Sequence, residues 1–154
     1  MEDATLGKAL EIEHRDIDGG IEAYLASLGG TADPAPLRAA LAGLRRHIYL
    51  EEQFLFPPLK AAGLMGPIFV MLREHGELWR SMDAVEALLA AAADTAAVRD
   101  ACTGLLALLD AHNSKEEPII YTQADQLLDG AASTELLDFL EGGTTPDGWV
   151  ASAA

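Results

Sequence analysis

The sequence has one cysteine, few aromatic residues and only ten lysines and arginines among 154 residues. A lone cysteine cannot form an internal disulfide, and Cys102 lies at helical spacing from Val98 and Leu105, which favours a small core residue. Basic residues are scattered and the net charge is −15, so we expect no nucleic-acid partner and no binding to anionic membranes. The chain also lacks a secretory signal and an apolar run of roughly 20 residues, from which we expect a cytoplasmic protein.

β-Branched residues are scarce as well, whereas alanine and leucine dominate and half of all residues are hydrophobic. Glycine and proline fall between long periodic stretches instead of at the short intervals typical of a β-sandwich. A chain of this length can bury one sizeable core but not two. The sequence therefore predicts a single all-α fold.

Apolar residues recur every three or four positions along four long stretches, which indicates amphipathic helices. The expected helices cover residues 6–28, 37–55, 67–89 and 95–127. Proline lacks a backbone N–H, so Pro57 and Pro58 should kink or end the second helix and Pro118 should bend the fourth. Four such helices joined by short turns most economically form an up-down-up-down four-helix bundle.

The end of the chain differs in composition from these stretches. A short helix is expected over residues 133–141, and the glycine-rich segment after it is typical of a weakly ordered tail unless Trp149 docks. We therefore assign residues 1–130 to the four-helix bundle and residues 131–154 to a short helix and weakly ordered tail.

The chain has only four histidines, one on each expected helix, and each lies on or one step from its apolar stripe. A single buried histidine is most often a hydrogen-bonded core residue. Four inward histidines on four helices are much harder to explain in that way. The four are His14, His47, His75 and His112.

Two glutamates sharpen this pattern, because each follows a histidine by four residues. Glu51 after His47 and Glu116 after His112 lie on the apolar stripes, one helical turn from their histidines. Burying an unpaired carboxylate costs several kcal/mol, so such a group needs a cation or must become neutral. The motif HxxxEE occurs twice, each time on the helix after one with a single histidine, so the first two helices repeat the pattern of the last two. Mixed nitrogen and oxygen ligands suit iron, manganese or zinc better than calcium or magnesium.

A histidine, then HxxxE, then a histidine, then HxxxE on four successive helices resembles the hemerythrin-like, or HHE cation-binding, family. The continuation EEQFLFP after the first HxxxE doublet is also similar to that family, and the resemblance covers about residues 6–128. It implies a hemerythrin-like bundle around two non-haem iron ions with an oxo or hydroxo bridge; manganese and zinc are less favoured. The implied metal ligands are His14, His47, Glu51, His75, His112 and Glu116.

The chain departs from the oxygen-carrying hemerythrins of this family. They have a further histidine one turn after the third-helix histidine, where this chain has Trp79, and their last acid would be Glu117. Helix geometry places Glu116 on the stripe and Glu117 about 100° away, so we prefer Glu116. The missing histidine leaves room for a small ligand or another acid. Asp18, one turn after His14, is a candidate, with a solvated or capping acid as the alternative.

Other acids and aromatic residues lie near these positions. The acids are expected to face solvent or to hold the ligand imidazoles through their second ring nitrogen; they are Glu11, Glu22, Glu52, Glu74, Glu77 and Glu117. The aromatic residues are expected in the core, where they could also keep the centre dry; they are Tyr24, Phe54, Phe69, Trp79 and Tyr121.

The resemblance implies a di-iron protein that binds O2, NO or peroxide, with a role in sensing, detoxification or iron handling. It leaves open whether the protein is an enzyme with peroxidase-like, catalase-like or NO/O2 redox activity. Because the fifth histidine is missing, we rank stable oxygen carriage below sensing, detoxification and iron handling. The alternative is a metal-free, iron-storing or iron-sensing helical interaction module without turnover. In the metal-free case the histidines would merely hydrogen-bond to Glu51 and Glu116. No motif indicates a protein partner.

Overall fold

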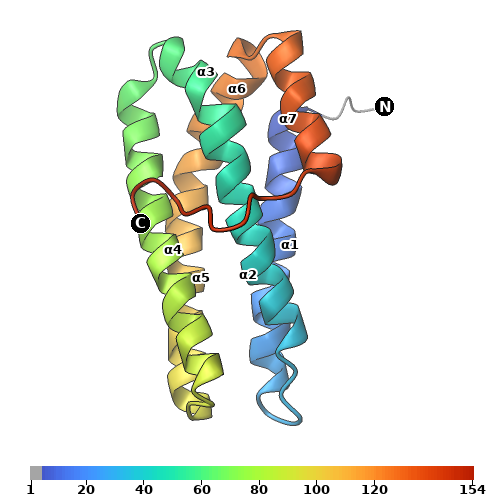
Figure 1. The fold of residues 1–154 in the computed structure, drawn as a ribbon, viewed down its shortest axis with the longest axis vertical. Coiled ribbons are helices and arrows are strands. Elements are labelled where there is room, and N and C mark those ends of the chain that lie inside the picture. Colours follow the sequence, from blue (N-terminus) through green and yellow to red (C-terminus); the bar gives the residue numbers. More distant parts are fainter. Residues whose placement is uncertain (1–4) are drawn as a thin grey trace.

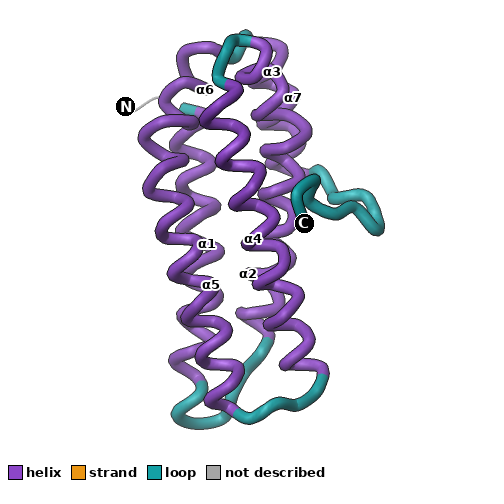
Figure 2. Tube along the Cα trace, turned by 90° about the vertical axis from the view of Figure 1, so that its left-hand side faces the viewer, coloured by secondary structure: helices purple, strands orange, loops and turns teal. Residues whose placement is uncertain are grey.

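Four long helices lie side by side, and successive helices run in opposite directions (Figures 1 and 2). The structure is a computed structural model that describes residues 5–154. The long helices are α1 (Leu6–Ser27), α2 (Ala35–Leu50), α4 (Met65–Ala90) and α5 (Thr95–Lys115). At the upper end in Figure 1, α2 continues into η1 (Glu51–Leu55) and α3 (Phe56–Ala61), and α5 continues into η2 (Glu116–Tyr121) and α6 (Thr122–Leu127). The last helix is α7 (Gly130–Gly142).

The prediction of an all-α bundle is confirmed, since residues 5–154 contain helices and loops and no β-strand. Local capping explains where helices begin. The Asp94 carboxylate accepts a hydrogen bond from the backbone N–H of Ala97 at the start of α5, and Thr5 does the same for Lys8 in α1. Over the described part of the chain, no helix is both long enough and apolar enough to cross a membrane.

Two helices have a π-helical turn close to their prolines and do not end there. In η1 the N–H of Phe56 donates to the carbonyl of Glu51, five residues earlier, which is π-helical hydrogen bonding. Pro57 and Pro58 then lie in the first turn of α3, so the helical path continues to Ala61. The expected interruption of the second helix is therefore a change in hydrogen bonding, and the helix does not end there.

The same change occurs in η2, which contains Pro118. A proline ring clashes with the carbonyl four residues earlier and offers no N–H, so a regular α-helical turn would be strained there. The wider turn removes this conflict. Both π-helical segments begin at the glutamate of an HxxxE motif, Glu51 in η1 and Glu116 in η2.

Two apolar clusters fill the bundle, one on each side of a layer of polar side chains. One cluster takes residues from all four long helices, among them Ile17, Leu44, Leu78 and Leu109. The other lies toward α3, α6 and α7, and includes Leu10, Leu50, Met71 and Ile120. Each fully buried side chain of this size contributes about 1.5–3 kcal/mol of hydrophobic stabilisation. The apolar clusters therefore fix the helices above and below the polar layer.

One aromatic residue expected in the core lies outside it. Tyr24, Trp79 and Tyr121 are buried, but the side chain of Phe69 is 68% exposed, so its core assignment was wrong. Its neighbour Ile68 is fully buried in α4. Adjacent residues on an α-helix differ by about 100° in direction, so Ile68 and Phe69 cannot both face the core.

The C-terminal tail crosses the bundle at about mid-height (Figure 1). Trp149 docks, which is the condition under which the sequence predicts an ordered tail. Its ring lies edge-on to Tyr49 of α2 and Trp79 of α4, with centroid distances of 5.0 and 5.5 Å. The backbone N–H of Ser152 donates to Glu52 at 3.1 Å. The tail therefore contacts two long helices, and the division of the chain near residue 130 stays a prediction.

Candidate metal centre

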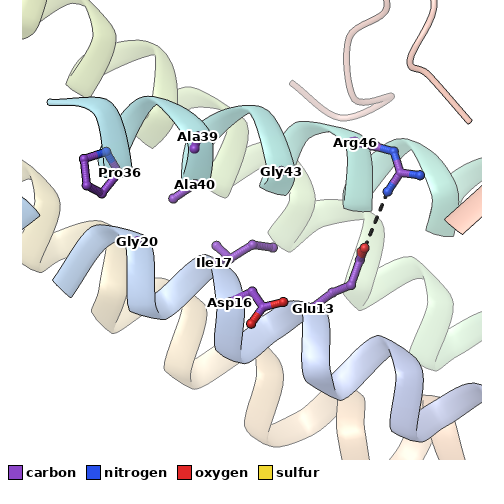
Figure 3. Close-up of a pocket in the computed structure, with 9 residues that line it drawn as sticks. All are labelled: Glu13, Asp16, Ile17, Gly20, Pro36, Ala39, Ala40, Gly43 and Arg46. Carbon is purple, nitrogen blue, oxygen red and sulfur yellow. Dashed lines mark hydrogen bonds and ion pairs between the residues drawn. The ribbon is translucent and has the colours of Figure 1, made fainter. Parts of the chain in front are cut away.

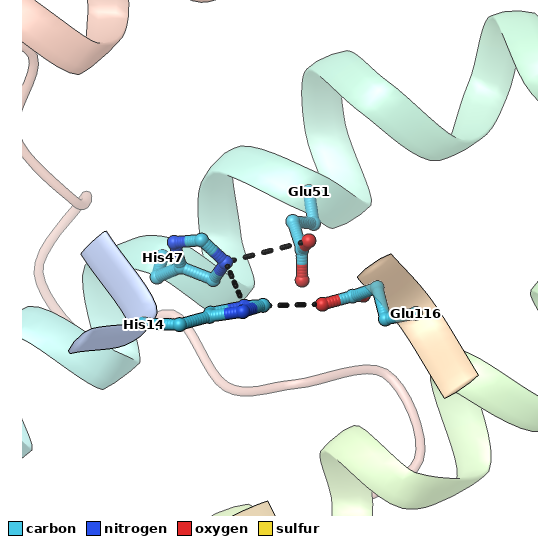
Figure 4. Close-up of side chains that lie close together, drawn as sticks. All are labelled: His14, His47, Glu51 and Glu116. Carbon is cyan, nitrogen blue, oxygen red and sulfur yellow. Dashed lines mark hydrogen bonds and ion pairs between the residues drawn. The ribbon is translucent and has the colours of Figure 1, made fainter. Parts of the chain in front are cut away.

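Six side chains from four helical segments converge in the polar layer. They are His14, His47, Glu51, His75, His112 and Glu116, and each is at most 4% exposed. They form two groups that share both glutamates, and within a group one nitrogen or oxygen atom of each residue lies within 4.8 Å of the others. We call His14, His47, Glu51 and Glu116 the His14 half-site (Figure 4), and Glu51, His75, His112 and Glu116 the His75 half-site. Each half-site could hold one metal ion.

A glutamate binds the Nδ1 atom of every histidine from outside the centre. The pairs are His14–Glu117 and His47–Glu13 at 2.8 Å, and His75–Glu52 and His112–Glu74 at 2.9 Å. An ionised carboxylate only accepts hydrogen bonds, so Nδ1 carries the proton in each pair. A neutral ring then presents the Nε2 lone pair to the centre, as a metal ligand must.

The two central glutamates each direct one oxygen to each half-site. The contacts with imidazole Nε2 atoms are Glu51 Oε2–His47 at 3.4 Å, Glu51 Oε1–His75 at 3.1 Å, Glu116 Oε1–His14 at 3.2 Å and Glu116 Oε2–His112 at 3.3 Å. A carboxylate that spans two adjacent half-sites in this way has the geometry of a bridging ligand. Glu116 Oε2 is fully buried and accepts no well-aligned hydrogen bond from the residues that the structure describes, so it has an unused lone pair in the interior.

In the metal-free protein, protons on the histidines balance the negative charge of the buried glutamates in the polar layer. Burial lowers the pKa of His47, but the Glu51 and Glu13 carboxylates outweigh it and raise the pKa to about 10. The pKa of His75 is likewise raised, to about 9, by Glu51 and Glu52 against the effect of burial. For Glu116, burial favours the neutral acid, but the adjacent imidazoles hold its pKa well below the usual range. Protonated histidines therefore balance the buried carboxylates, and a metal cation would compete with these protons.

Tyr121 places a hydroxyl group inside the His14 half-site. Its oxygen lies 2.9 Å from His14 Nε2 and 3.0 Å from His47 Nε2. It lies 2.7 Å from Glu51 Oε2 and 3.0 Å from Glu116 Oε1. Burial and the two carboxylates raise the pKa of this phenol well above its usual range, so in the metal-free protein it stays protonated and donates to them.

All six ligands expected from the sequence lie together in the structure; that they bind metal is a proposal. Asp18 is not part of either half-site in the described part of the chain. Glu116 points inward, as preferred, whereas Glu117 holds His14 from outside. Trp79, at the position of the missing histidine, packs under the Arg45 guanidinium 4.5 Å from its ring centre.

Two residues that contact the candidate ligands were not predicted from the sequence: Glu13, and Tyr121 through its hydroxyl group. A signal for Glu13 was present, because the dipeptide Glu-His occurs in both single-histidine helices, as Glu13-His14 and Glu74-His75. In each case the glutamate holds the histidine of the following helix. Tyr121 was expected in the core, where it could also keep the centre dry. Contact of its hydroxyl group with Glu116 was not predicted, and residues five apart do not share a face of a regular α-helix.

A pocket of about 320 Å³ lies between α1 and α2 beside the His14 half-site (Figure 3). Small residues form much of its lining: Gly20 on α1, and Ala39, Ala40 and Gly43 on α2. Glu13, which holds His47, lines its inner end together with Arg46. None of the six candidate ligands lines this pocket, so it adjoins the centre without opening into it.

Comparisons with known proteins identify a family and several partial relatives. The model of a family described as the hemerythrin HHE cation-binding domain matches residues 5–124. Over 57 residues the chain is 42% identical to the iron-sulfur cluster repair protein YtfE of Yersinia pestis (strain Pestoides F) and to its namesake from Yersinia pseudotuberculosis (serotype O:1b). The matched segment covers 35% of this chain and 26% of each relative, so the chain spans about a quarter of the length of these curated relatives. No solved structure gives a significant match.

Proposed function

This chain belongs to the hemerythrin HHE cation-binding family, and from that premise we propose that its polar layer holds two iron ions that bind O2, NO or peroxide. One observation carries the proposal. Glu51 and Glu116 each offer one oxygen to each half-site, and two histidines complete each of them. This donor set suits a pair of bridged transition-metal ions.

The residues present also fit iron in their charge and their unused lone pairs. Two buried carboxylates with low pKa values need positive charge near them, and Glu116 Oε2 has no aligned donor within residues 5–154. The Nε2 atoms of His14 and His47 face each other at 3.1 Å, so their lone pairs repel unless a proton or a cation lies between them. A metal ion at each half-site would satisfy all of these groups at once.

The chain's own residues orient the histidine rings, connect the two half-sites and exclude bulk water from them. Hydrogen bonds from Nδ1 to the outer glutamates fix the ring of each histidine, and the two central glutamates join the half-sites. The apolar clusters on either side exclude bulk water, which strengthens electrostatic interactions at the centre. Bound iron would supply electron transfer and open coordination positions for a small ligand.

A role in iron handling is a second candidate, and the relatives favour it. The similar Yersinia proteins are named for iron-sulfur cluster repair, and a repair process requires iron to be supplied or removed. The match covers only part of those proteins, so this role is a proposal for the present chain. It predicts that iron leaves the reduced protein readily to a competing chelator, whereas a ligand-binding protein retains it.

The test begins with the metal content of protein purified without chelator, or loaded with ferrous iron under anaerobic conditions. We expect about two irons per chain and an absorption spectrum that changes with dithionite and again with air, NO or peroxide. The matched variant carries Glu51→Gln and Glu116→Gln, which keep the side-chain size but remove both charges, and it should bind little or no iron. No iron uptake by the wild type would favour the metal-free module and overturn the proposal.

A further inference from the structure

The two half-sites are not chemically equivalent, although the repeated motif makes them look so. Tyr121 in η2 and Phe56 at the start of α3 follow the glutamates of their HxxxE motifs at the same spacing. Tyr121 stacks on His14 and Phe56 stacks on His75, each with ring centroids 5.3 Å apart. The His14 half-site therefore contains a phenolic oxygen where the His75 half-site has only a ring C–H.

The Tyr121 oxygen lies where a further metal ligand of the His14 half-site would be expected. Ligands about 2.1 Å from a first-row metal ion and at right angles to each other are about 3.0 Å apart. The Tyr121 oxygen lies 2.7–3.0 Å from one donor atom of each of the four residues of the His14 half-site. Neighbouring donors around the half-site are separated by similar distances, 3.1 Å for His14–His47 and 3.2 Å for His14–Glu116.

The phenolic oxygen therefore lies about one ligand-to-ligand distance from a donor atom of every residue of the half-site. A metal ion held by those four residues would be within reach of the phenolic oxygen as well. From this geometry we infer that Tyr121 is a seventh metal-binding residue, which ligates the ion at the His14 half-site, while the His75 half-site takes the exogenous ligand. The inference rests on the proposed function only in requiring that metal binds.

The π-helical turn is what brings Tyr121 to this position. In an α-helix, a residue five places after Glu116 points well away from it. With i→i+5 hydrogen bonding, residues five apart lie one above the other, and the Tyr121 hydroxyl reaches Glu116 Oε1. Single π-helical turns of this kind are frequent at functional sites.

Ligation exchanges a proton for a metal ion. The phenolic O–H bond breaks, the oxygen keeps the electron pair and donates it to the metal, and the proton leaves to solvent. No change of oxidation state is involved. A metal ion held by the half-site would be the largest local charge there and would favour the phenolate as its ligand.

The His75 half-site offers more room for an exogenous ligand at the metal, and a separate pocket lies outside it. Its four donors leave more of the metal's coordination positions free, because no hydroxyl group takes the place of Tyr121. A pocket of about 390 Å³ lies on its outer side and is lined in part by Phe56 and Glu52, which both contact His75. A small molecule in this pocket would be separated from the half-site by those two side chains.

Iron gives this inference a spectroscopic test, because a phenolate bound to ferric iron absorbs visible light by charge transfer. The air-oxidised, iron-loaded wild type should show this band, with tyrosine ring vibrations enhanced in its resonance Raman spectrum. Tyr121→Phe should lose the band and the vibrations completely and still bind about two irons through the six other ligands. Tyr24→Phe and Tyr49→Phe remove the other two tyrosines and should leave both signals unchanged.

Azide, used as a small anionic probe, tests the second half of the inference. It should add its own absorption band to the wild type while the tyrosine vibrations persist. Phe56→Tyr offers a hydroxyl to the His75 half-site and should intensify the phenolate band and weaken azide binding. Loss of the tyrosine vibrations on azide binding would overturn this assignment of the open position.

The outcomes separate the inference from the proposed function. A wild type with two ferric irons but no tyrosine vibrations would overturn ligation by Tyr121 and leave the di-iron proposal standing. A wild type that takes up no iron would overturn both. The wild-type spectrum decides the question even where Tyr121→Phe folds poorly, which its melting temperature would reveal.

Discussion

Each candidate histidine ligand depends on one outer glutamate for its orientation. Glu13 accepts from His47 Nδ1 at 2.8 Å and lies 3.5 Å from the Arg46 guanidinium, so its charge is held in place. A negative partner at Nδ1 makes the opposite nitrogen a better electron donor. The orientation and the basicity of His47 therefore come from a residue that does not touch the metal position.

Replacing Glu13 with glutamine should weaken iron binding by about 10- to 100-fold, because such outer partners commonly contribute that much. The amide oxygen can still accept the hydrogen bond, but the charge is lost. Competition with a coloured iron chelator under anaerobic conditions measures the change. Glu11→Gln is the matched control on the same helix, since among residues 5–154 Glu11 makes only a surface ion pair of 3.9 Å with Arg15. Equal affinities of both variants would contradict the role of Glu13.

The six candidate ligands were predictable because their pattern is local. HxxxE places two side chains one helical turn apart, and this can be read from the sequence without knowing the partner helices. The position of Tyr121 was not predictable in this way, because it depends on a π-helical turn that a regular helix would not contain. Pro118, two residues after Glu116, was the available signal for that turn.

At the scale of elements, the tail can pack closely against α4 because the contact residue in α4 is a glycine, Gly76. Gly76 lies in the middle of α4, and a Cβ atom there would collide with the backbone carbonyl of Ala153 in the tail. Arg80, one turn later, donates to that same carbonyl at 3.0 Å. A glycine in a helix normally costs stability, and here it permits the close approach of the tail.

Gly76→Ala should therefore destabilise the docked tail even though alanine favours the helix. Gly104→Ala in α5 is the control, because its Cβ would meet no atom of the described chain within 4 Å, and it should stabilise the protein by up to about 1 kcal/mol. Acrylamide quenching of tryptophan fluorescence reports whether Trp149 leaves its contacts. We expect greater quenching and a lower melting temperature for Gly76→Ala than for Gly104→Ala. The reverse order would show that α4 does not hold the tail through this contact.

The four long helices could be read from apolar periodicity, but the docking of the tail could not. Trp149 packs against Tyr49 and Trp79, which belong to two different helices far away in the sequence. No local pattern connects these residues, and the composition of the tail alone favours disorder. Their proximity is a consequence of the completed bundle.

At the scale of the whole molecule, a charged layer interrupts the apolar interior, and its stability depends on what balances the charge. In the metal-free protein the raised pKa values of His47 and His75, about 10 and about 9, stabilise the fold. This contribution is fully present below the unfolded pKa of 6.5 and is lost as the pH rises through these values. The lowered pKa values of Glu51 and Glu116 stabilise the fold above 4.5 and lose their effect as the pH falls.

Metal binding should counteract the loss of stability at alkaline pH. Metal replaces the imidazole protons, so its affinity rises as the pH increases and fewer protons compete. The melting temperature of the metal-free protein should fall between about pH 6 and about pH 9, while the gap between the iron-loaded and metal-free forms widens. At a free metal concentration of about 100 times Kd, binding adds about 2.7 kcal/mol to the free energy of unfolding.

Calorimetry of both forms at the two pH values, under argon, measures this gap. The added free energy corresponds to a rise in melting temperature of about 5–10 °C for a chain of this size. The double variant Glu51→Gln, Glu116→Gln should show no iron-dependent rise at either pH, because the bridging charges are gone. Its metal-free form should also lose most of the alkaline decline, since neutral amides no longer hold His47 and His75 in the charged state. A gap in the wild type that narrows with rising pH would mean that iron binds without displacing the imidazole protons, which is incompatible with ligation through Nε2.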